Sequence, residues 1–305
     1  MTTQTEVDQT DNSIAIGEGI STAFSLLFSN LATAFKLAIM PVISILIIAV
    51  VLFFFVVQLI LDIQANPSPD LPVMYSIVTI GIAVLVTLIP IQYFTAWIRF
   101  LNTGNASISE TFVFNLKKRH FVIFGKSFLL YIVMNIAIAI AVGLITFAFS
   151  ASEMLSAIAL IIAIFLIFVV ALRLSYVFPA AALDQPYSFF KSWTDTKGQW
   201  LSLLVSFIIL SILFVIMQIA LIFVIGVFFT IFGGASSLLI GGASDLSQSL
   251  AGLMSISTLL LVIPAYFIIL IISMISYIPF INLHYYCFKK NAGWIDDNKL
   301  VDRFS

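Results

Sequence analysis

Basic and aromatic side chains gather in the short polar segments that separate the long apolar runs of this sequence. The set comprises Arg99, Lys117, Lys118, Arg119, Arg173, Lys191, Trp193 and Lys197. A lysine or arginine beside an anionic leaflet contributes about 1 kcal/mol of attraction, and tryptophan favours the depth of the lipid headgroups. We therefore expect these residues to contact lipid headgroups. The alternative is that their charges only set the orientation of the chain in the membrane.

Two amide side chains, Asn135 and Gln218, lie within apolar runs instead of between them. An amide surrounded by hydrocarbon needs a hydrogen-bond partner, so it either joins two helices or lines a polar cavity. Asn135, Ala139 and Gly143 recur every four residues, a spacing that brings small side chains onto one helix face. We expect helix–helix contact first and a path for a small solute second.

The residue types needed for catalysis are present but do not come together. Ser236 and Ser244 follow Gly-Ala pairs, yet His120 and His284 are expected at the opposite membrane face, about 30 Å away. Neither histidine has Cys, Asp or Glu at metal-ligand spacing, and the single cysteine cannot form a thiolate site. The sequence therefore predicts a protein that is not an enzyme and has no cofactor or metal.

Composition places this chain in a membrane. Of its 305 residues 62% are hydrophobic and 9% charged, its mean hydropathy is +1.19, and its formal net charge is −1. Soluble domains carry about 25% charged residues, so this chain has too few charges to cover its surface in water. The scarcity of basic residues also argues against a nucleic-acid partner. A membrane protein is the class that fits.

The elements that position the basic residues are long apolar runs. Crossing the hydrocarbon requires about 20 apolar residues in a helix. Six runs meet this length, at 37–61, 71–98, 127–152, 154–172, 200–232 and 255–287. We predict an all-α integral membrane protein with six transmembrane helices in three hairpins. A single domain over 14–288 would follow a polar tail at 1–13 and precede a C-terminal tail at 289–305.

The orientation follows from the lysine and arginine residues. All 13 of them lie before the first span, after the last span, or in the connections after the second and fourth spans. By the positive-inside rule both termini and these connections are cytoplasmic. The opposite connections are external, including 233–254, which is either a flexible loop or a re-entrant segment.

Segments before the odd-numbered spans predict interfacial helices. Residues 14–35 place Ile16, Ile20, Phe24, Leu27, Leu31 and Phe35 on one helical stripe. That pattern is typical of an amphipathic helix lying in the membrane interface. Residues 107–126 and 186–200 occupy similar positions. The chain would then consist of three units, 14–100, 107–180 and 186–288, unless the similarity reflects only three successive hairpins.

One segment carries a more particular pattern. Arg173, Pro179–Ala180, Asp184, Ser192–Trp193 and Lys197–Gly198 follow each other over 173–200. This segment resembles an uncharacterised family of bacterial polytopic inner-membrane proteins. That family is related to the membrane domain fused to some glycerophosphodiester phosphodiesterases. The resemblance implies a bacterial inner-membrane location and a role near lipids, and it transfers no catalytic residue.

These observations lead to three functional hypotheses. The first is a non-enzymatic protein that binds membrane lipid, anionic lipid included, or organises an envelope complex. The second is a permease or channel for a small solute, with a path along Asn135 and Gln218. The third is an accessory subunit of a larger membrane complex. Protein partners and homo-oligomers are compatible with all three, because apolar helices can face lipid or another subunit.

Overall fold

The computed structural model describes residues 15–65, 73–105, 107–112, 114–149, 152–232 and 256–291. Within these residues the chain is helical and contains no strand, as the sequence predicts. The elements in chain order are α1 (Ile16–Ser29), α2 (Leu31–Ala65), α3 (Val73–Thr103), η1 (Ile108–Thr111), α4 (Lys118–Ala148), α5 (Glu153–Leu174), α6 (Val177–Ala182), α7 (Phe189–Asp195), α8 (Trp200–Phe232), α11 (Ile256–Ser276) and α12 (Ile278–Asn291).

Six helical stretches are long and apolar enough to cross a membrane, which confirms the predicted number for the described residues. They are Leu31–Leu61, Val78–Thr103, Lys118–Ala148, Glu153–Ala182, Trp200–Val224 and Pro264–Asn291. The chain therefore has the make-up of a multi-pass membrane protein. The tail at 1–13, residues 292–305 and the connection at 233–254 lie outside the described residues.

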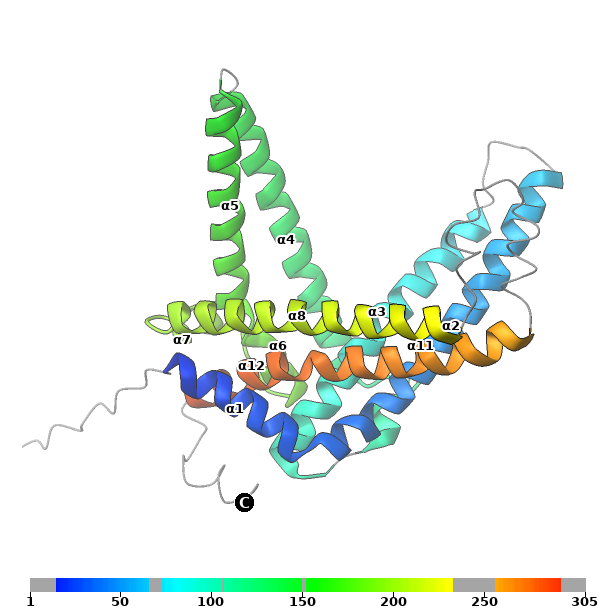
Figure 1. Cartoon of the computed structure of the whole chain (residues 1–305). Helices are drawn as coiled ribbons and strands as arrows, with labels where there is room; N and C mark the ends of the chain where they lie inside the picture. The colour runs from blue at the N-terminus through cyan, green and yellow to red at the C-terminus, as the bar shows by residue number, and fades with distance from the viewer. Residues whose placement is uncertain are drawn as a thin grey trace, which may run out of the picture.

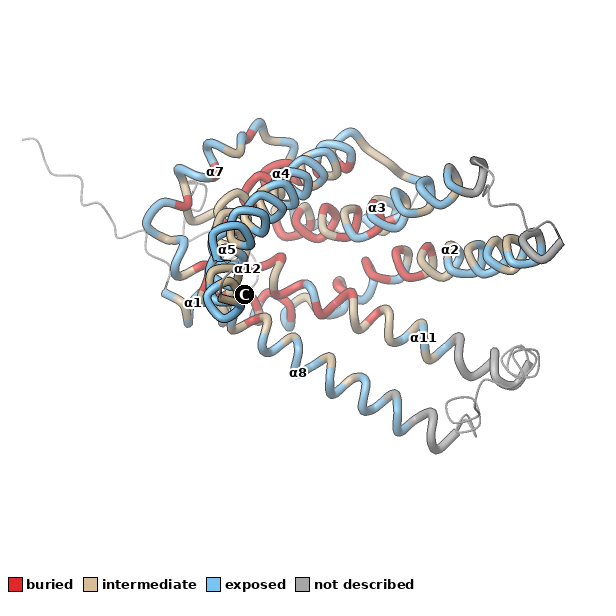
Figure 2. Tube along the Cα trace, turned by 90° about the horizontal axis from the view of Figure 1, so that it is seen from above, coloured by how far each residue is buried: buried red, intermediate tan, exposed pale blue. Residues whose placement is uncertain are grey.

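The long helices lie in neighbouring pairs that diverge from a common base. Contacts join α2 to α3, α4 to α5 and α8 to α11 (Figure 1). The base is formed by α1, α6, α12 and the adjoining ends of the long helices. Figure 2 shows that buried positions gather there, while the far ends of the long helices are mostly exposed. Phe147 of α4, for example, is 86% exposed. Apolar surface of this kind suits hydrocarbon and not water.

A buried amide ties three elements of the base together. The Asn282 side chain of α12 donates to the carbonyl oxygen of Ala23 at 2.7 Å, and its oxygen accepts from the Trp97 indole at 2.7 Å. Asn282, Ala23 and Trp97 are completely buried. Because unpaired polar groups are costly in a low-dielectric interior, this arrangement fixes α1 and α3 against α12.

Helix α1 is packed more fully than an isolated interfacial helix would be. Its buried residues are Gly19, Ala23, Leu26 and Leu27, so the buried face is offset from the predicted stripe, on which Phe24 is only half-buried. Gly19 has no side chain and Ala23 has only a methyl group, so α1 can approach α12 closely. Glu18 also pairs with Lys290 at 3.1 Å and accepts a hydrogen bond from the Tyr286 hydroxyl.

The other two predicted interfacial segments differ from expectation. Within 107–126 only η1 forms a separate element, because residues from Lys118 onward belong to the long helix α4. Within 186–200 the helix is limited to α7. It begins after Ser188, whose hydroxyl accepts the Lys191 amide at 3.1 Å. Serine is a good N-cap because its hydroxyl pairs with a free amide of the first turn.

The break between α5 and α6 lies just before Pro179. α5 ends at Leu174, and α6 begins at Val177 and contains Pro179. A proline ring clashes with the carbonyl four residues earlier, which here belongs to Ser175. The helical ladder therefore ends before the proline is reached. This break brings the end of α5 next to α7, where most of the sequence pattern at 173–200 lies.

Candidate functional site

Three of the predicted basic residues form an ion-paired cluster with two carboxylates. We use this name for Arg99, Glu110, Lys117, Arg119 and Asp184. Arg99 on α3 lies between the two acids, with Nε 3.5 Å from Glu110 and Nη1 3.2 Å from Asp184. Lys117 also pairs with Glu110, and Nη2 of Arg119 lies 3.3 Å from Asp184. The cluster thus joins α3, η1 and α4 to Asp184, which lies two residues after the end of α6.

Glu110 is the most enclosed acid of the ion-paired cluster, with a side chain 15% exposed. Burial alone would raise the pKa of its carboxyl. The hydrogen bond and charge of Lys117, together with the charges of Arg99 and Arg119, outweigh burial and hold the pKa below its ordinary value. Glu110 therefore stays ionised at neutral pH and neutralises part of the surrounding positive charge.

The segment that carries Glu110 and Lys117 is fixed by buried polar groups. Gln92 of α3 is fully buried, and its amide donates to the carbonyl oxygen of Phe112 at 3.0 Å. The buried His120 ring accepts the backbone amide of Lys117 at 3.1 Å. Both contacts hold the connection between α3 and α4 in one conformation. This conformation places Glu110 and Lys117 where they form the ion pairs of the cluster.

The remaining residues of the predicted set, except Lys118, lie at or beside α7. We call residues 187–198 the α7 segment. Lys191 and Lys197 are exposed, and no carboxylate in the described part of the chain lies within ion-pair distance of either. The Lys191 ammonium lies 5.2 Å from the centre of the Tyr187 ring. Phe190 is 81% exposed, and Trp193 is also exposed. The segment therefore presents free positive charge beside aromatic surface.

Arg173 holds the α7 segment in place. Its guanidinium lies 3.5 Å from the centre of the Trp193 ring and donates to the Trp193 carbonyl oxygen at 2.6 Å. It also lies 3.3 Å from the Thr196 hydroxyl. The buried Ser192 hydroxyl donates to the Arg173 carbonyl oxygen at 2.6 Å and accepts the Tyr176 amide at 3.2 Å. Arg173 is thus engaged with α7 itself.

Tyr187 fixes the start of the α7 segment through two hydrogen bonds. Its hydroxyl donates to the Asp195 carboxylate at 2.5 Å, and its carbonyl oxygen accepts from Lys126 at 2.9 Å. Burial, followed by the hydrogen bond and charge of Asp195, raises the pKa of the Tyr187 hydroxyl. Asp195 is the acid nearest in sequence to Lys191 and Lys197, and this bond directs its carboxylate to Tyr187 instead.

The other predicted polar positions are not part of these two groups. Lys118 is the first residue of α4, is exposed, and has no ion pair among the described residues. Asn135 is exposed on α4, and its amide donates to the Tyr131 carbonyl oxygen of its own helix at 2.8 Å. Gln218 lies half-buried on α8. The amide of Asn135 therefore bonds within its own helix, and the solute path stays a prediction.

Several residues that build the site were not singled out from the sequence. Glu110 neutralises two predicted lipid contacts, Gln92 fixes the connection that carries Glu110, and the Thr196 hydroxyl contacts Arg173 at the end of α5. For the shape of the backbone around α7, the sequence did contain a signal. Gly198 has φ +88°, a conformation that favours glycine, so the Lys197–Gly198 step of the pattern reflects backbone geometry. Asp184, with φ 59°, likewise ends α6 in a left-handed conformation.

The fold and the site together define a multi-pass, all-helical membrane protein with a basic, aromatic segment at its packed base. In the described residues no group of three or more His, Cys, Asp or Glu side chains could hold a metal ion. Comparisons with protein-family models, with curated proteins and with solved structures found no match to this chain. The resemblance carried by residues 173–200 therefore stays a prediction.

Proposed function

We propose that this chain is a non-enzymatic protein of the bacterial inner membrane that binds anionic lipid headgroups through the α7 segment. In this proposal the six apolar helices cross the membrane as three hairpins, and both termini are cytoplasmic. The base, including α7, then faces the cytoplasmic leaflet, where anionic lipids create a negative surface potential. Bound lipid would anchor or organise the protein within the envelope.

The observation that carries the proposal is the free charge of the α7 segment. Lys191 and Lys197 are exposed and form no ion pair with a carboxylate in the described residues, and the exposed Trp193 lies between them in the sequence. Lysine stems can lie along apolar surface while the ammonium reaches a phosphate, and the tryptophan ring favours headgroup depth. These are the groups that an anionic headgroup requires.

The ion-paired cluster is a weaker candidate for the same role. It has three cations against two carboxylates, which leaves a formal charge of +1. A phosphate would have to compete with Glu110 and Asp184 for groups that already have partners. We therefore assign Arg99, Lys117 and Arg119 mainly to holding the base together, and Arg173 to positioning α7.

The test measures headgroup selectivity. Wild-type protein and the double variant Lys191→Gln/Lys197→Gln are reconstituted in nanodiscs of mixed phosphatidylglycerol and phosphatidylcholine, and the lipids that stay with the protein are quantified by mass spectrometry. Each lysine contributes about 1 kcal/mol, or about fivefold in binding. We expect the double variant to lose most of the enrichment in phosphatidylglycerol.

A matched control separates a local site from general charge. Lys36 is an exposed lysine at the start of α2 with no ion pair among the described residues, and it lies outside the α7 segment. Lys36→Gln should leave the enrichment close to wild type. Equal losses in both proteins would contradict a site at α7 and favour a general effect of positive charge.

A further inference from the structure

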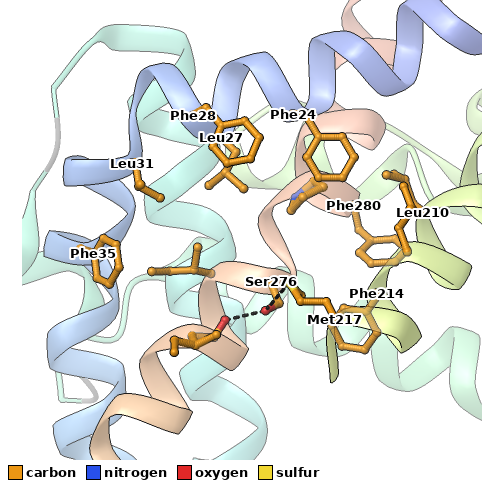
Figure 3. A pocket seen from close by; sticks show the side chains of 14 residues that line it. Phe24, Leu27, Phe28, Leu31, Phe35, Leu210, Phe214, Met217, Ser276 and Phe280 are labelled. Carbon is orange, nitrogen blue, oxygen red and sulfur yellow. Dashed lines mark hydrogen bonds between the residues drawn. The ribbon is translucent and has the colours of Figure 1, made fainter. Parts of the chain in front are cut away.

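An apolar pocket lies where α1 and the start of α2 face α8, α11 and α12. Its volume is about 420 Å³. Figure 3 shows Phe24, Phe28 and Phe35 on one side, with Leu210 and Met217 of α8 on the other. Because its walls come from both ends of the chain, the pocket exists only when α1 is docked in the base.

The lining of the pocket selects for hydrocarbon. Among the described residues that line it, Ser276 alone has a polar side chain other than the thioether of Met217. Its hydroxyl already donates to the Ile272 carbonyl oxygen at 2.6 Å and lies 3.7 Å from the Met217 sulfur (Figure 3). A polar ligand would find no free partner in this lining and would lose its hydration, which is unfavourable.

Part of the pocket wall lies well inside α8, a candidate membrane span. At about 1.5 Å per residue, Leu210 is about 15 Å and Met217 about 25 Å along α8 from Trp200. If Trp200 marks the headgroups, these lining residues face the acyl region of the membrane. The rim is exposed and apolar as well, with Phe28 66% exposed, so the pocket opens onto surface that lipid would cover.

The volume distinguishes between apolar occupants. A cavity of 420 Å³ falls within the range of small-ligand pockets, about 300–1,000 Å³. It would accommodate only about one turn of a helix whose diameter is about 10 Å. A helix from a second copy would therefore fill it poorly, whereas a flexible hydrocarbon chain can follow its shape.

We propose that this pocket holds one acyl chain of a membrane lipid. The inference rests on the membrane location in the proposed function, but it does not depend on the α7 segment. An occupied pocket would fill the space between α1, α8 and α12, and so would stabilise the docking of the N-terminal helix against the C-terminal part of the chain.

The test counts lipid retained by the full chain after exhaustive detergent washing. Protein is reconstituted with phosphatidylcholine alone, so that an anionic headgroup is not needed, then washed and analysed by native mass spectrometry. We expect about one lipid per wild-type chain. Met217→Trp and Leu213→Trp place a larger side chain in the pocket and should each reduce retention at least fivefold. Two blocking variants are used because one alone could disturb folding.

The matched control is Ile216→Trp. Ile216 neighbours Met217 on α8, is 58% exposed and does not line the pocket. This variant should retain lipid like wild type. Absence of retained lipid in the wild type, or equal retention in the blocking variants, would overturn the proposal. It would also be overturned if Met217→Trp dissociated a dimer while leaving the retained lipid unchanged, because the pocket would then be a contact between copies.

The two lipid proposals can fail separately. Loss of phosphatidylglycerol enrichment in Lys191→Gln/Lys197→Gln, with phosphatidylcholine still retained in the pocket, supports both. Enrichment that is insensitive to these lysines contradicts only the α7 proposal. Retention that is insensitive to Met217→Trp and Leu213→Trp contradicts only the pocket.

Discussion

The ion-paired cluster and the α7 segment both gather cations but present their charge differently. The cluster holds Arg99, Lys117 and Arg119, and the α7 segment holds Lys191 and Lys197 beside aromatic side chains. In the cluster, Glu110 and Asp184 pair with Arg99, Lys117 and Arg119. In the α7 segment, Lys191 and Lys197 have no carboxylate partner among the described residues. Counting basic residues therefore does not show which of them are available to a ligand.

The difference arises from where the fold directs its acids. η1 turns Glu110 toward α3, and the left-handed residue Asp184 reaches both Arg99 and Arg119. Asp195 lies within the α7 segment, but its carboxylate accepts the Tyr187 hydroxyl and forms no ion pair with a lysine in the described residues. One acid is thus used to fix α7 while the lysines beside it stay free. This contrast can be tested residue by residue.

The largest effect is expected from Arg173→Ala, which removes the anchor of the α7 segment. The variant loses charge-assisted hydrogen bonds and the stack on Trp193, and such bonds contribute about 1.5–3 kcal/mol each. We expect the free energy of unfolding to fall by about 2–3 kcal/mol. Hydrogen exchange of the amides in 189–195 should become faster. Denaturant unfolding in micelles and hydrogen exchange provide the measurements.

Arg173→Lys serves as the comparison for that variant. It keeps the positive charge but cannot reproduce the planar stack and forked hydrogen bonding. If Arg173 positions α7, the lysine variant should behave more like alanine than like wild type. Wild-type protection of 189–195 in Arg173→Lys would show that charge alone is sufficient.

Glu110→Gln should make the ion-paired cluster resemble the α7 segment. The substitution leaves Arg99 and Lys117 without their shared carboxylate and raises the formal charge of the cluster from +1 to +2. Because Glu110 is mostly buried, we expect a loss of about 1–2 kcal/mol in stability. Enrichment of phosphatidylglycerol should increase in the nanodisc assay. Unchanged enrichment would mean that the carboxylates do not limit access to these cations.

Single lysine substitutions compare the two regions directly. Lys191→Gln should weaken the association with phosphatidylglycerol by about fivefold and change stability by less than about 0.5 kcal/mol. Lys117→Gln should have the reverse pattern, with lower stability and little change in lipid, because its ammonium already pairs with Glu110. Lipid mass spectrometry and denaturant unfolding of the same preparations give both readouts. Equal lipid losses in both variants would remove the distinction between the regions.

The sequence was sufficient for the features that depend on local composition. The length and hydropathy of the apolar runs predicted helices and the number of candidate spans, because each run alone satisfies the requirement for crossing hydrocarbon. The positions of Lys191, Trp193 and Lys197 in a polar segment were also readable. The boundaries of α7 were not, since they depend on capping by Ser188 and on docking against Arg173.

Features that depend on contacts between distant residues could not be read from the sequence. Nothing near Asn282 indicates that its amide bridges Trp97 and Ala23, because those partners lie far away along the chain. Asp184 is part of the sequence pattern at 173–200, but its pairing with arginines from α3 and α4 depends on residues far away along the chain. Whether a basic side chain is free to bind a ligand depends on contacts with residues far away in the sequence. The sequence alone therefore predicted both basic regions as lipid contacts.

The smallest expected effect is a difference in how the stability of the two regions depends on pH. The folded-state pKa of Glu110 lies below its ordinary value of 4.5, so its ion pairs stabilise the base above that pH. That stabilisation is lost as the pH falls through the lower, folded-state value. Stability measured from pH 6 downward should therefore decrease more in wild type than in Glu110→Gln.

Tyr187 predicts the opposite response for the α7 segment. Burial and Asp195 raise its folded-state pKa above the ordinary value of 10.0, so the buried hydroxyl stays neutral while the unfolded chain ionises. Stability from this group is complete below pH 10.0 and falls as the pH rises further, and Tyr187→Phe should remove that alkaline loss. Thermal unfolding of wild type and both variants across the two pH ranges tests the contrast. An acid-sensitive α7, or a cluster sensitive only to alkali, would contradict the assignment of the acids on which the comparison depends.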